Sequence, residues 1–289
     1  MSTHRIQNSR GLNALVDARG AALIEMWVPD REGSLGNVLE RQTSHRYAGV
    51  TVGRVANRVD AGRFQLDGDN YQLTCNEGLH HLHGGGQGSL DKLTWDAGTN
   101  PSSVTFRAQS PDGDEGYPGH LDVSVTYSLT DQDELVIEYH ATTTRPTPVN
   151  LTNHAYWNLG GALQNHDLLI RSSLTLQTNE QLIPTGVLEP VEGSGRDFTR
   201  TRPVGSLPFD HTCVLDGDSS AATLSCRASG RSMIVSTTEP TLQLFTTDTA
   251  LCLEAQGFPD AVNHPEFPSV ILRPGQAYRQ TTRHQFVLC

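Results

Sequence analysis

The chain has 289 residues, which suffices for one large β domain or two small ones with a substantial buried core. Its 21 lysine and arginine residues stand against 32 aspartate and glutamate residues, so the formal net charge is −11. An acidic chain without basic clusters repels a phosphate backbone, and we therefore expect no nucleic-acid partner.

The five cysteines are odd in number and include no Cys-x-x-Cys pair, which argues against a disulfide framework and against a zinc ribbon. A reducing compartment fits this pattern. The first ten residues contain no apolar stretch after their charges, and no later run reaches the length of a membrane span. We expect a cytoplasmic protein without a membrane partner, present as a monomer or a weak dimer.

Apolar and polar residues alternate along much of the chain, and this period of two is typical of half-buried strands. In chain order, strands are expected at residues 12–16, 22–28, 121–129, 135–142, 233–238, 242–247 and 251–256. The pair 121–129 and 135–142 is the clearest, because one face of its first strand is entirely apolar and residues 130–134 supply a turn. We predict an antiparallel hairpin there.

Sustained helical periodicity is hard to find, and 27 glycines and 15 prolines punctuate the sequence. This composition favours a sandwich of antiparallel sheets with little helix. No internal repeat or low-complexity tract is visible, and the stretches 84–89 and 190–208 have the composition of ordinary connections rather than of domain linkers. The sequence therefore predicts an all-β chain that forms a single domain over residues 1–289.

Six segments carry motifs such as Gly-Arg-Val-Ala-Asn-Arg, Leu-His-Gly-Gly, Asn-Leu-Thr-Asn-His and Cys-Leu-Glu. They lie at residues 49–58, 76–85, 112–119, 149–159, 209–243 and 251–275. In kind and in order they resemble the aldose 1-epimerases, also called galactose mutarotases. The resemblance implies the large antiparallel β-sandwich of that family, known as a supersandwich, with a sugar cleft on one broad sheet face.

The resemblance also implies a reaction, the interconversion of the α and β anomers of free aldoses such as galactose or glucose. Opening the sugar ring requires one proton to leave the C1 hydroxyl while another reaches the ring oxygen, so two titratable groups are needed. A carboxylate suits the first transfer and an imidazolium the second, since burial and neighbouring groups can tune both pKa values toward neutrality. No cofactor is expected.

His154 and Glu254 are the residues that the resemblance assigns to these transfers, as acid and base respectively. Judged without the flanking motifs, a histidine between Asn153 and Ala155 is more often a hydrogen-bonded structural residue. A carboxylate on a strand is likewise more often exposed to solvent. The matched motifs favour the catalytic roles over both alternatives, although Ala255 replaces the threonine that the family carries beside the base.

A neutral sugar presents hydroxyl groups that donate and accept hydrogen bonds, so its site should mix amide, imidazole, guanidinium and carboxylate groups. The resemblance implies that such groups come from Asn57, Arg58, His83, Tyr156, Asp210 and Gln243. The residues alone leave other roles open: the arginine can pair with a strand carboxylate, the aspartate can cap a turn, and the glutamine can be an exposed strand residue.

The run His80-His81-Leu82-His83 offers three imidazoles within four residues, a pattern that invites a metal hypothesis. Neighbouring residues on a strand point to opposite faces, and no adjacent cysteine or carboxylate set completes a coordination shell. The resembled family works without a metal. We therefore expect no metal site, and activity that a chelator leaves unchanged.

The connections at residues 28–49 and 198–209 are shorter than the resemblance leads us to expect, which leaves the substrate preference open. Two alternatives to a mutarotase of free sugars remain. A hexose-phosphate 1-epimerase of the same fold would need several arginines around a dianion, whereas the matched positions include only Arg58. A sugar-binding or regulatory domain without catalysis would retain the cleft and lose the chemistry.

Overall fold

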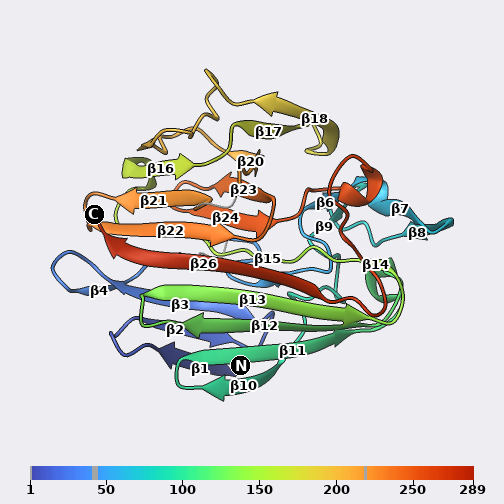
Figure 1. Cartoon of the computed structure of the whole chain (residues 1–289), viewed down its shortest axis with the longest axis horizontal. Helices are drawn as coiled ribbons and strands as arrows, with labels where there is room; N and C mark the ends of the chain where they lie inside the picture. The colour runs from blue at the N-terminus through green and yellow to red at the C-terminus, as the bar shows by residue number, and fades with distance from the viewer. Residues whose placement is uncertain (1, 41–44, 218–219) are drawn as a thin grey trace.

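The computed structural model describes residues 2–40, 45–217 and 220–289 (Figure 1). Within these residues the regular structure is β-strand apart from four short 3₁₀ helices, at Asp60–Gly62, Asp114–Gly116, Leu163–Asn165 and Ala261–Asn263. The all-β prediction is confirmed. Part of the shortened segment 28–49 falls on residues 41–44, outside the described residues.

The largest sheet has nine antiparallel strands, in the order β10-β11-β12-β13-β26-β22-β21-β16-β19. Its long central strands cross the width of the molecule in Figure 1. The strands, in this order, are Asp96–Asn100, Ser103–Ser110, Leu121–Leu129, Glu134–Thr143, Tyr278–Leu288, Arg231–Thr237, Ala222–Cys226, His166–Ile170 and Arg202–Pro203. The predicted hairpin is β12 and β13, which pair from Leu121 with Thr143 to Leu129 with Leu135.

A five-stranded antiparallel sheet, ordered β18-β17-β20-β23-β24, lies beside the upper part of the large sheet (Figure 1). Its strands are Pro184–Pro190, Leu174–Thr178, Asp210–Val214, Thr241–Thr246 and Leu251–Gln256. A four-stranded sheet of β1 to β4 comprises Thr3–Gln7, Asn13–Asp17, Ala22–Pro29 and Leu35–Asn37, and β1 contacts β11 and β12 of the large sheet.

Four two-stranded pairs connect these sheets and carry several motif segments. They are β5 (Thr51–Val52) with β15 (Thr152–Asn153), β6 (Arg58–Val59) with β9 (His81–Leu82), β7 (Arg63–Leu66) with β8 (Asp69–Gln72), and β14 (Thr147–Pro148) with β25 (Ile271–Leu272). Within the described chain, no helix is both long and apolar enough to cross a membrane.

The main hydrophobic core joins side chains from all three large sheets, for example Val16 of β2, Val125 of β12 and Leu253 of β24. Strand β24 is buried on both faces along its whole length. Leu251, Leu253 and Ala255 belong to this core, so the alternating residues Cys252, Glu254 and Gln256 project from the opposite face. The fold thereby places a carboxylate where water is largely excluded.

Candidate active site

The two residues expected to carry the chemistry are 100 positions apart in the sequence and adjacent in the structure. His154 follows β15 and Glu254 lies on β24, with 3.8 Å between His154 Nε2 and Glu254 Oε1. Their exposed fractions are 5% and 3%. The reading of Glu254 as a solvent-facing strand residue is therefore wrong, and an imidazole and a carboxylate lie together in one buried place.

Glu254 belongs to a row of polar side chains that crosses the sheet. It pairs across the strands with Gln243 of β23, which in turn pairs with Thr212 of β20. The Thr212 hydroxyl donates to Gln243 Oε1 at 2.6 Å, and Gln243 Nε2 donates to Asp210 Oδ1 at 2.6 Å. Gln243 is only 5% exposed, so the register of three strands fixes an amide and two carboxylates on one face.

Asp210 retains contact with solvent at the edge of this row. The surrounding protein nevertheless excludes enough water to raise its pKa, although the hydrogen bond from Gln243 acts in the opposite direction. Asp210 is therefore held by a strand neighbour rather than capping a turn.

A second group of predicted residues comes from the β6 and β9 pair. The Asn57 and His83 backbones bond to each other, since the His83 N–H donates to Asn57 O at 3.0 Å. The Asn57 N–H donates to His83 Nδ1 at 3.1 Å. Burial holds the pKa of His83 well below its usual value, so the ring is neutral and carries its one proton on Nε2. His83 is thus fixed as a hydrogen-bond donor.

Glycine is required directly after His83. Gly84 has a φ of +86°, and a Cβ at this position would lie 1.7 Å from the carbonyl oxygen of Gly53. Only a residue without a side chain permits this approach of two backbones. The centroid of the His83 ring lies 5.4 Å from that of His154.

Arg58 is mostly buried, and its guanidinium Nη2 lies 3.6 Å from Glu77 Oε1. Its backbone carbonyl accepts a hydrogen bond from the Asp260 N–H at 3.1 Å. The arginine therefore does pair with a carboxylate, as one alternative held. That carboxylate lies in the loop before β9 rather than on one of the long strands, and the pairing keeps Arg58 beside the polar row.

Aromatic rings surround His154. The ring of Tyr156 lies 5.1 Å from the imidazole, and its hydroxyl donates to Arg46 O at 2.8 Å, so that hydroxyl has a protein partner. Tyr47 lies 4.7 Å from the His83 ring and 5.8 Å from that of His154. Phe245, two residues after Gln243 on the same strand face, lies 6.5 Å from His154.

Tyr47, Phe245 and Thr212 are site residues that the sequence reasoning missed. Tyr47 precedes the first motif segment by two residues, and Phe245 shares the period-two face of Gln243. Their positions beside motif residues could have identified both aromatic residues as candidates. Nothing in the sequence indicates Thr212, because its contact with Gln243 depends on the register between β20 and β23.

Burial shifts the two central groups in opposite directions. Desolvation raises the pKa of Glu254, with a smaller contribution from the nearby Asp210 charge, and desolvation lowers the pKa of His154. The attraction between an imidazolium and a carboxylate opposes both effects. Because the groups are so close, they titrate as a pair that holds one proton between them. Glu254 Oε2 has no hydrogen-bond partner in the described chain.

His83, His154 and Glu254 each place a potential metal-ligating atom within 4.8 Å of the others. The bonding of His83 makes this a poor metal site, because Nδ1 already accepts a hydrogen bond and the single ring proton is then on Nε2. The neighbouring His81 is also committed, through Nδ1 to Thr74 O at 2.7 Å and through Nε2 to the Tyr117 hydroxyl at 2.7 Å. The three histidines of the motif therefore do not form a coordination shell together.

Comparison with known proteins agrees with this geometry. The family model described as aldose 1-epimerase matches residues 2–285. Galactose mutarotase of Rattus norvegicus is 38% identical, with 95% of this chain and 91% of the relative covered. Galactose mutarotase of Homo sapiens is also 38% identical, at 92% and 89% coverage. Aldose 1-epimerase of Escherichia coli is 32% identical, at 98% and 94%.

Solved structures give the same result. The aldose epimerase homologue from C. elegans superimposes with a TM-score of 0.94 at 31% identity, covering 99% of both chains. The galactose 1-epimerase from Lactobacillus acidophilus has a TM-score of 0.87 at 25% identity, with 100% of this chain and 99% of that chain covered. On the family match and the identities over nearly its whole length, this chain belongs to the aldose 1-epimerase family.

Proposed function

We propose that the chain interconverts the α and β anomers of free aldoses such as galactose or glucose, with Glu254 as base and His154 as acid. The observation that carries the assignment is the 3.8 Å separation of His154 Nε2 and Glu254 Oε1 in a nearly water-free place. The hydroxyl oxygen and the ring oxygen of an aldose are bonded to the same carbon, C1. Two neighbouring side chains can therefore serve both oxygens at once.

The reaction begins with an ionised carboxylate and a protonated imidazole. Glu254 removes the proton from the C1 hydroxyl while His154 gives its proton to the ring oxygen. The bond from C1 to the ring oxygen breaks, and the electron pair left on the hydroxyl oxygen forms the aldehyde. Rotation about the bond from C1 to C2 presents the other face of the carbonyl. The same two transfers in reverse then close the ring as the other anomer.

Burial suits this cycle for a thermodynamic reason. In water, a carboxylate with an imidazolium is much more stable than a carboxylic acid with a neutral imidazole. Desolvation raises the Glu254 pKa to about 8 and lowers the His154 pKa to about 4, which favours the neutral pair. The attraction between the two charges favours the ion pair and opposes this effect. A reaction that must run through both states in each direction is fastest when neither is a deep minimum.

The surrounding residues suit a polyol. Asp210 offers carboxylate oxygens, Gln243 an amide, and Arg58 a guanidinium group, while neutral His83, whose ring lies beside that of His154, carries an Nε2–H donor. Asn57 fixes the imidazole of His83, because its backbone N–H bonds to that ring. The rings of Tyr47 and Phe245 provide apolar surface for the C–H groups of a sugar.

Polarimetry with the purified protein tests the proposal. Freshly dissolved α-D-galactose and α-D-glucose should reach anomeric equilibrium faster in proportion to protein concentration. Equilibration no faster than in buffer, over a panel of aldoses, would refute it. Faster anomerisation of glucose 6-phosphate than of glucose would favour the hexose-phosphate alternative. Sugar binding in calorimetry without any rate would favour the non-catalytic one.

A further inference from the structure

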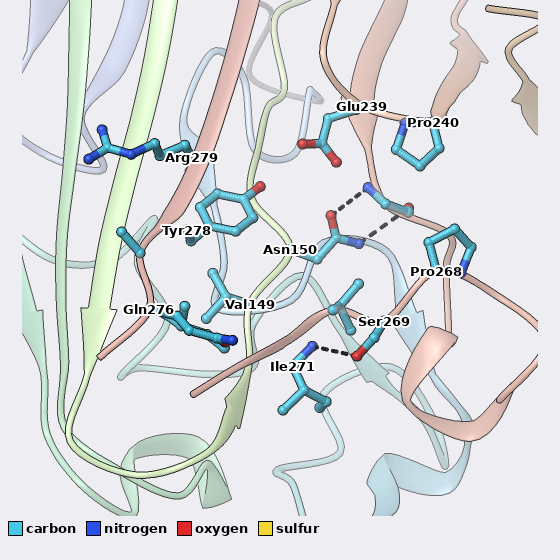
Figure 2. Close-up of a pocket in the computed structure, with 14 residues that line it drawn as sticks. Val149, Asn150, Glu239, Pro240, Pro268, Ser269, Ile271, Gln276, Tyr278 and Arg279 are labelled. Atoms are coloured by element: carbon cyan, nitrogen blue, oxygen red, sulfur yellow. Dashed lines mark hydrogen bonds between the residues drawn. The ribbon is translucent and has the colours of Figure 1, made fainter. Parts of the chain in front are cut away.

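A second pocket, with a volume of about 610 Å³, lies at the opposite end of β23 from Asp210. Its walls come from the turn between β22 and β23, the residues after β14, the chain from 268 to 272, and the start of β26 (Figure 2). None of the eight candidate site residues lines it. The volume falls in the range of small-molecule sites, roughly 300–1,000 Å³.

Most polar side chains that line this pocket are already bonded to the protein. The Asn150 amide donates to Gly257 O at 3.3 Å and accepts from the Gly257 N–H at 2.8 Å (Figure 2). The Tyr278 hydroxyl donates to Gln280 Oε1 at 2.8 Å and accepts from the Leu151 N–H at 3.2 Å. These groups shape the pocket and have little capacity left for a ligand.

Glu239 is the exception among the side chains of this pocket that can accept a hydrogen bond. Its carboxylate makes no hydrogen bond or ion pair with any residue of the described chain, and burial alone raises its pKa to about 7. In Figure 2 the carboxylate faces the space between Tyr278 and Asn150, whereas the side chain of Arg279 extends away from it. A half-buried carboxylate without a partner is costly, and a bound cation would offset that cost.

Apolar side chains make up much of the pocket lining. They include Val149, Ile271 and the rings of Pro240 and Pro268. A sugar would need several convergent donors and acceptors, and the bonded state of Asn150 and Tyr278 leaves too few. A ligand with one strongly donating, positively charged end and an apolar body matches both the single free acceptor and the walls.

We propose that this pocket is a second binding site, for a small organic ammonium ion whose charged end bonds to Glu239 and whose apolar part contacts the prolines and Val149. The site is independent of the sugar chemistry, because it shares no lining residue with the acid/base pair.

Isothermal titration with cyclohexylammonium chloride tests this inference, with cyclohexanol as the neutral probe of similar shape. The ammonium ion should bind, and the alcohol should bind at least about tenfold more weakly, since it lacks the charge-assisted hydrogen bond. Glu239→Gln should weaken ammonium binding by about tenfold or more. Glu192→Gln removes the same charge from an exposed position and should change the affinity by less than about twofold.

Two further arms keep the outcomes distinct. Ammonium binding should weaken as the pH falls below the Glu239 pKa, while Tyr278 and Arg279, the other ionisable groups lining the pocket, keep their charge states. Glu254→Gln should leave ammonium binding unchanged even though it disables the proposed chemistry. Equal binding of alcohol and ammonium, an unaltered affinity in Glu239→Gln, or no ammonium binding by the wild-type protein would each overturn the proposal.

Discussion

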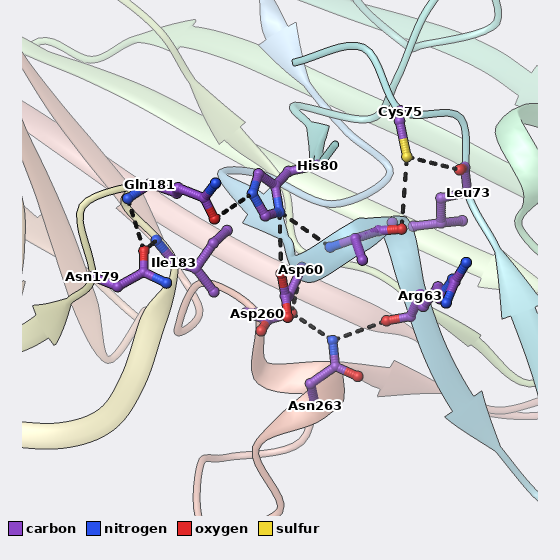
Figure 3. Close-up of polar contacts among 12 residues, drawn as sticks. Asp60, Arg63, Leu73, Cys75, His80, Asn179, Gln181, Ile183, Asp260 and Asn263 are labelled. Carbon is purple, nitrogen blue, oxygen red and sulfur yellow. Dashed lines mark hydrogen bonds and ion pairs between the residues drawn. The ribbon is translucent and has the colours of Figure 1, made fainter. Parts of the chain in front are cut away.

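Two buried histidines of the described chain, His80 and His154, each lie beside a carboxylate, and their clusters differ in how completely the atoms are bonded. In the first, His80 Nδ1 lies 3.1 Å from both the Ala61 nitrogen and Asp60 Oδ1, and its Nε2 lies 3.3 Å from Gln181 Oε1 (Figure 3). Asp260 Oδ1 accepts hydrogen bonds from the Asp60 N–H at 3.1 Å and from Asn263 at 2.7 Å.

The second cluster, of His154 and Glu254, is more deeply buried and less satisfied. Its imidazole and carboxylate are 3.8 Å apart, beyond a good hydrogen bond, and Glu254 Oε2 has no partner in the described chain. A fully bonded cluster stabilises the chain, whereas buried groups that lack partners are available to a ligand. We therefore assign the first cluster to the structural framework and the second to the candidate site. A hydrogen bond from the Asp260 N–H to Arg58 O connects the first cluster to a candidate site residue.

The largest effect should come from Glu254→Gln, which removes the base and keeps the shape. We expect kcat for anomer interconversion to fall by about 10²–10⁴-fold, the usual contribution of general acid or base catalysis. Glu266→Gln, which neutralises an exposed carboxylate, is the matched control and should retain its kcat. Comparable rates for Glu254→Gln and the control would mean that the base is another residue.

His154 and His80 belong to the two different clusters, so replacing each of them should have a different effect. His154→Asn should lower kcat by a factor similar to that for Glu254→Gln, with little change in stability. His80→Asn should instead lower the free energy of unfolding by about 1–3 kcal/mol, because it removes the polar contacts of a buried ring, and should largely preserve kcat. Polarimetry and denaturant unfolding of both variants measure these effects. A reversed pattern would show that the bonded cluster is the catalytic one.

Stability as a function of pH gives a smaller, independent signal. The folded-state pKa of Glu254 is raised, so the wild-type protein loses stability as the pH rises from the unfolded-state value through the folded one. Glu254→Gln cannot titrate and should escape this loss, so its free energy of unfolding should improve relative to wild type with increasing pH. Parallel stability curves for the two proteins over this interval would contradict the raised pKa.

The smallest expected effect is none at all. Incubation with EDTA followed by its removal should leave kcat unchanged, since His83 uses Nδ1 as an acceptor and Nε2 as a donor and has no free lone pair for a metal. Activity that is lost on chelation and restored by a divalent cation would show that His83, His154 and Glu254 act as ligands instead.

How far the sequence predicts the structure depends on whether the signal is local. Strand 251–256 has the bounds expected from its motif, and the expected strand 12–16 is found one residue later, at Asn13–Asp17. A period-two pattern lies within one short segment, so it predicts a strand without knowledge of the neighbouring strands. The burial of Glu254 was not visible locally, because it depends on β23 and on the segment after β15 covering one face of its strand.

The same reasoning explains the mixed outcome for the site. Motifs identified the candidate residues, and the structure places them around His154. Which hydrogen bonds these residues make could be seen only in the folded structure. The Tyr156 hydroxyl donates to Arg46 O, and Thr212, 31 positions earlier in the sequence, donates to the Gln243 side chain. Such contacts depend on strand register and loop approach, which a single sequence does not encode in any short window.

The most direct measurement of the central claim is the initial rate of optical rotation change of freshly dissolved α-D-galactose, with wild-type protein, with Glu254→Gln and with His154→Asn. If the buried pair carries the reaction, the wild-type rate rises in proportion to protein concentration and both variants remain close to the rate in buffer. Either variant matching the wild-type rate while folded would contradict the account.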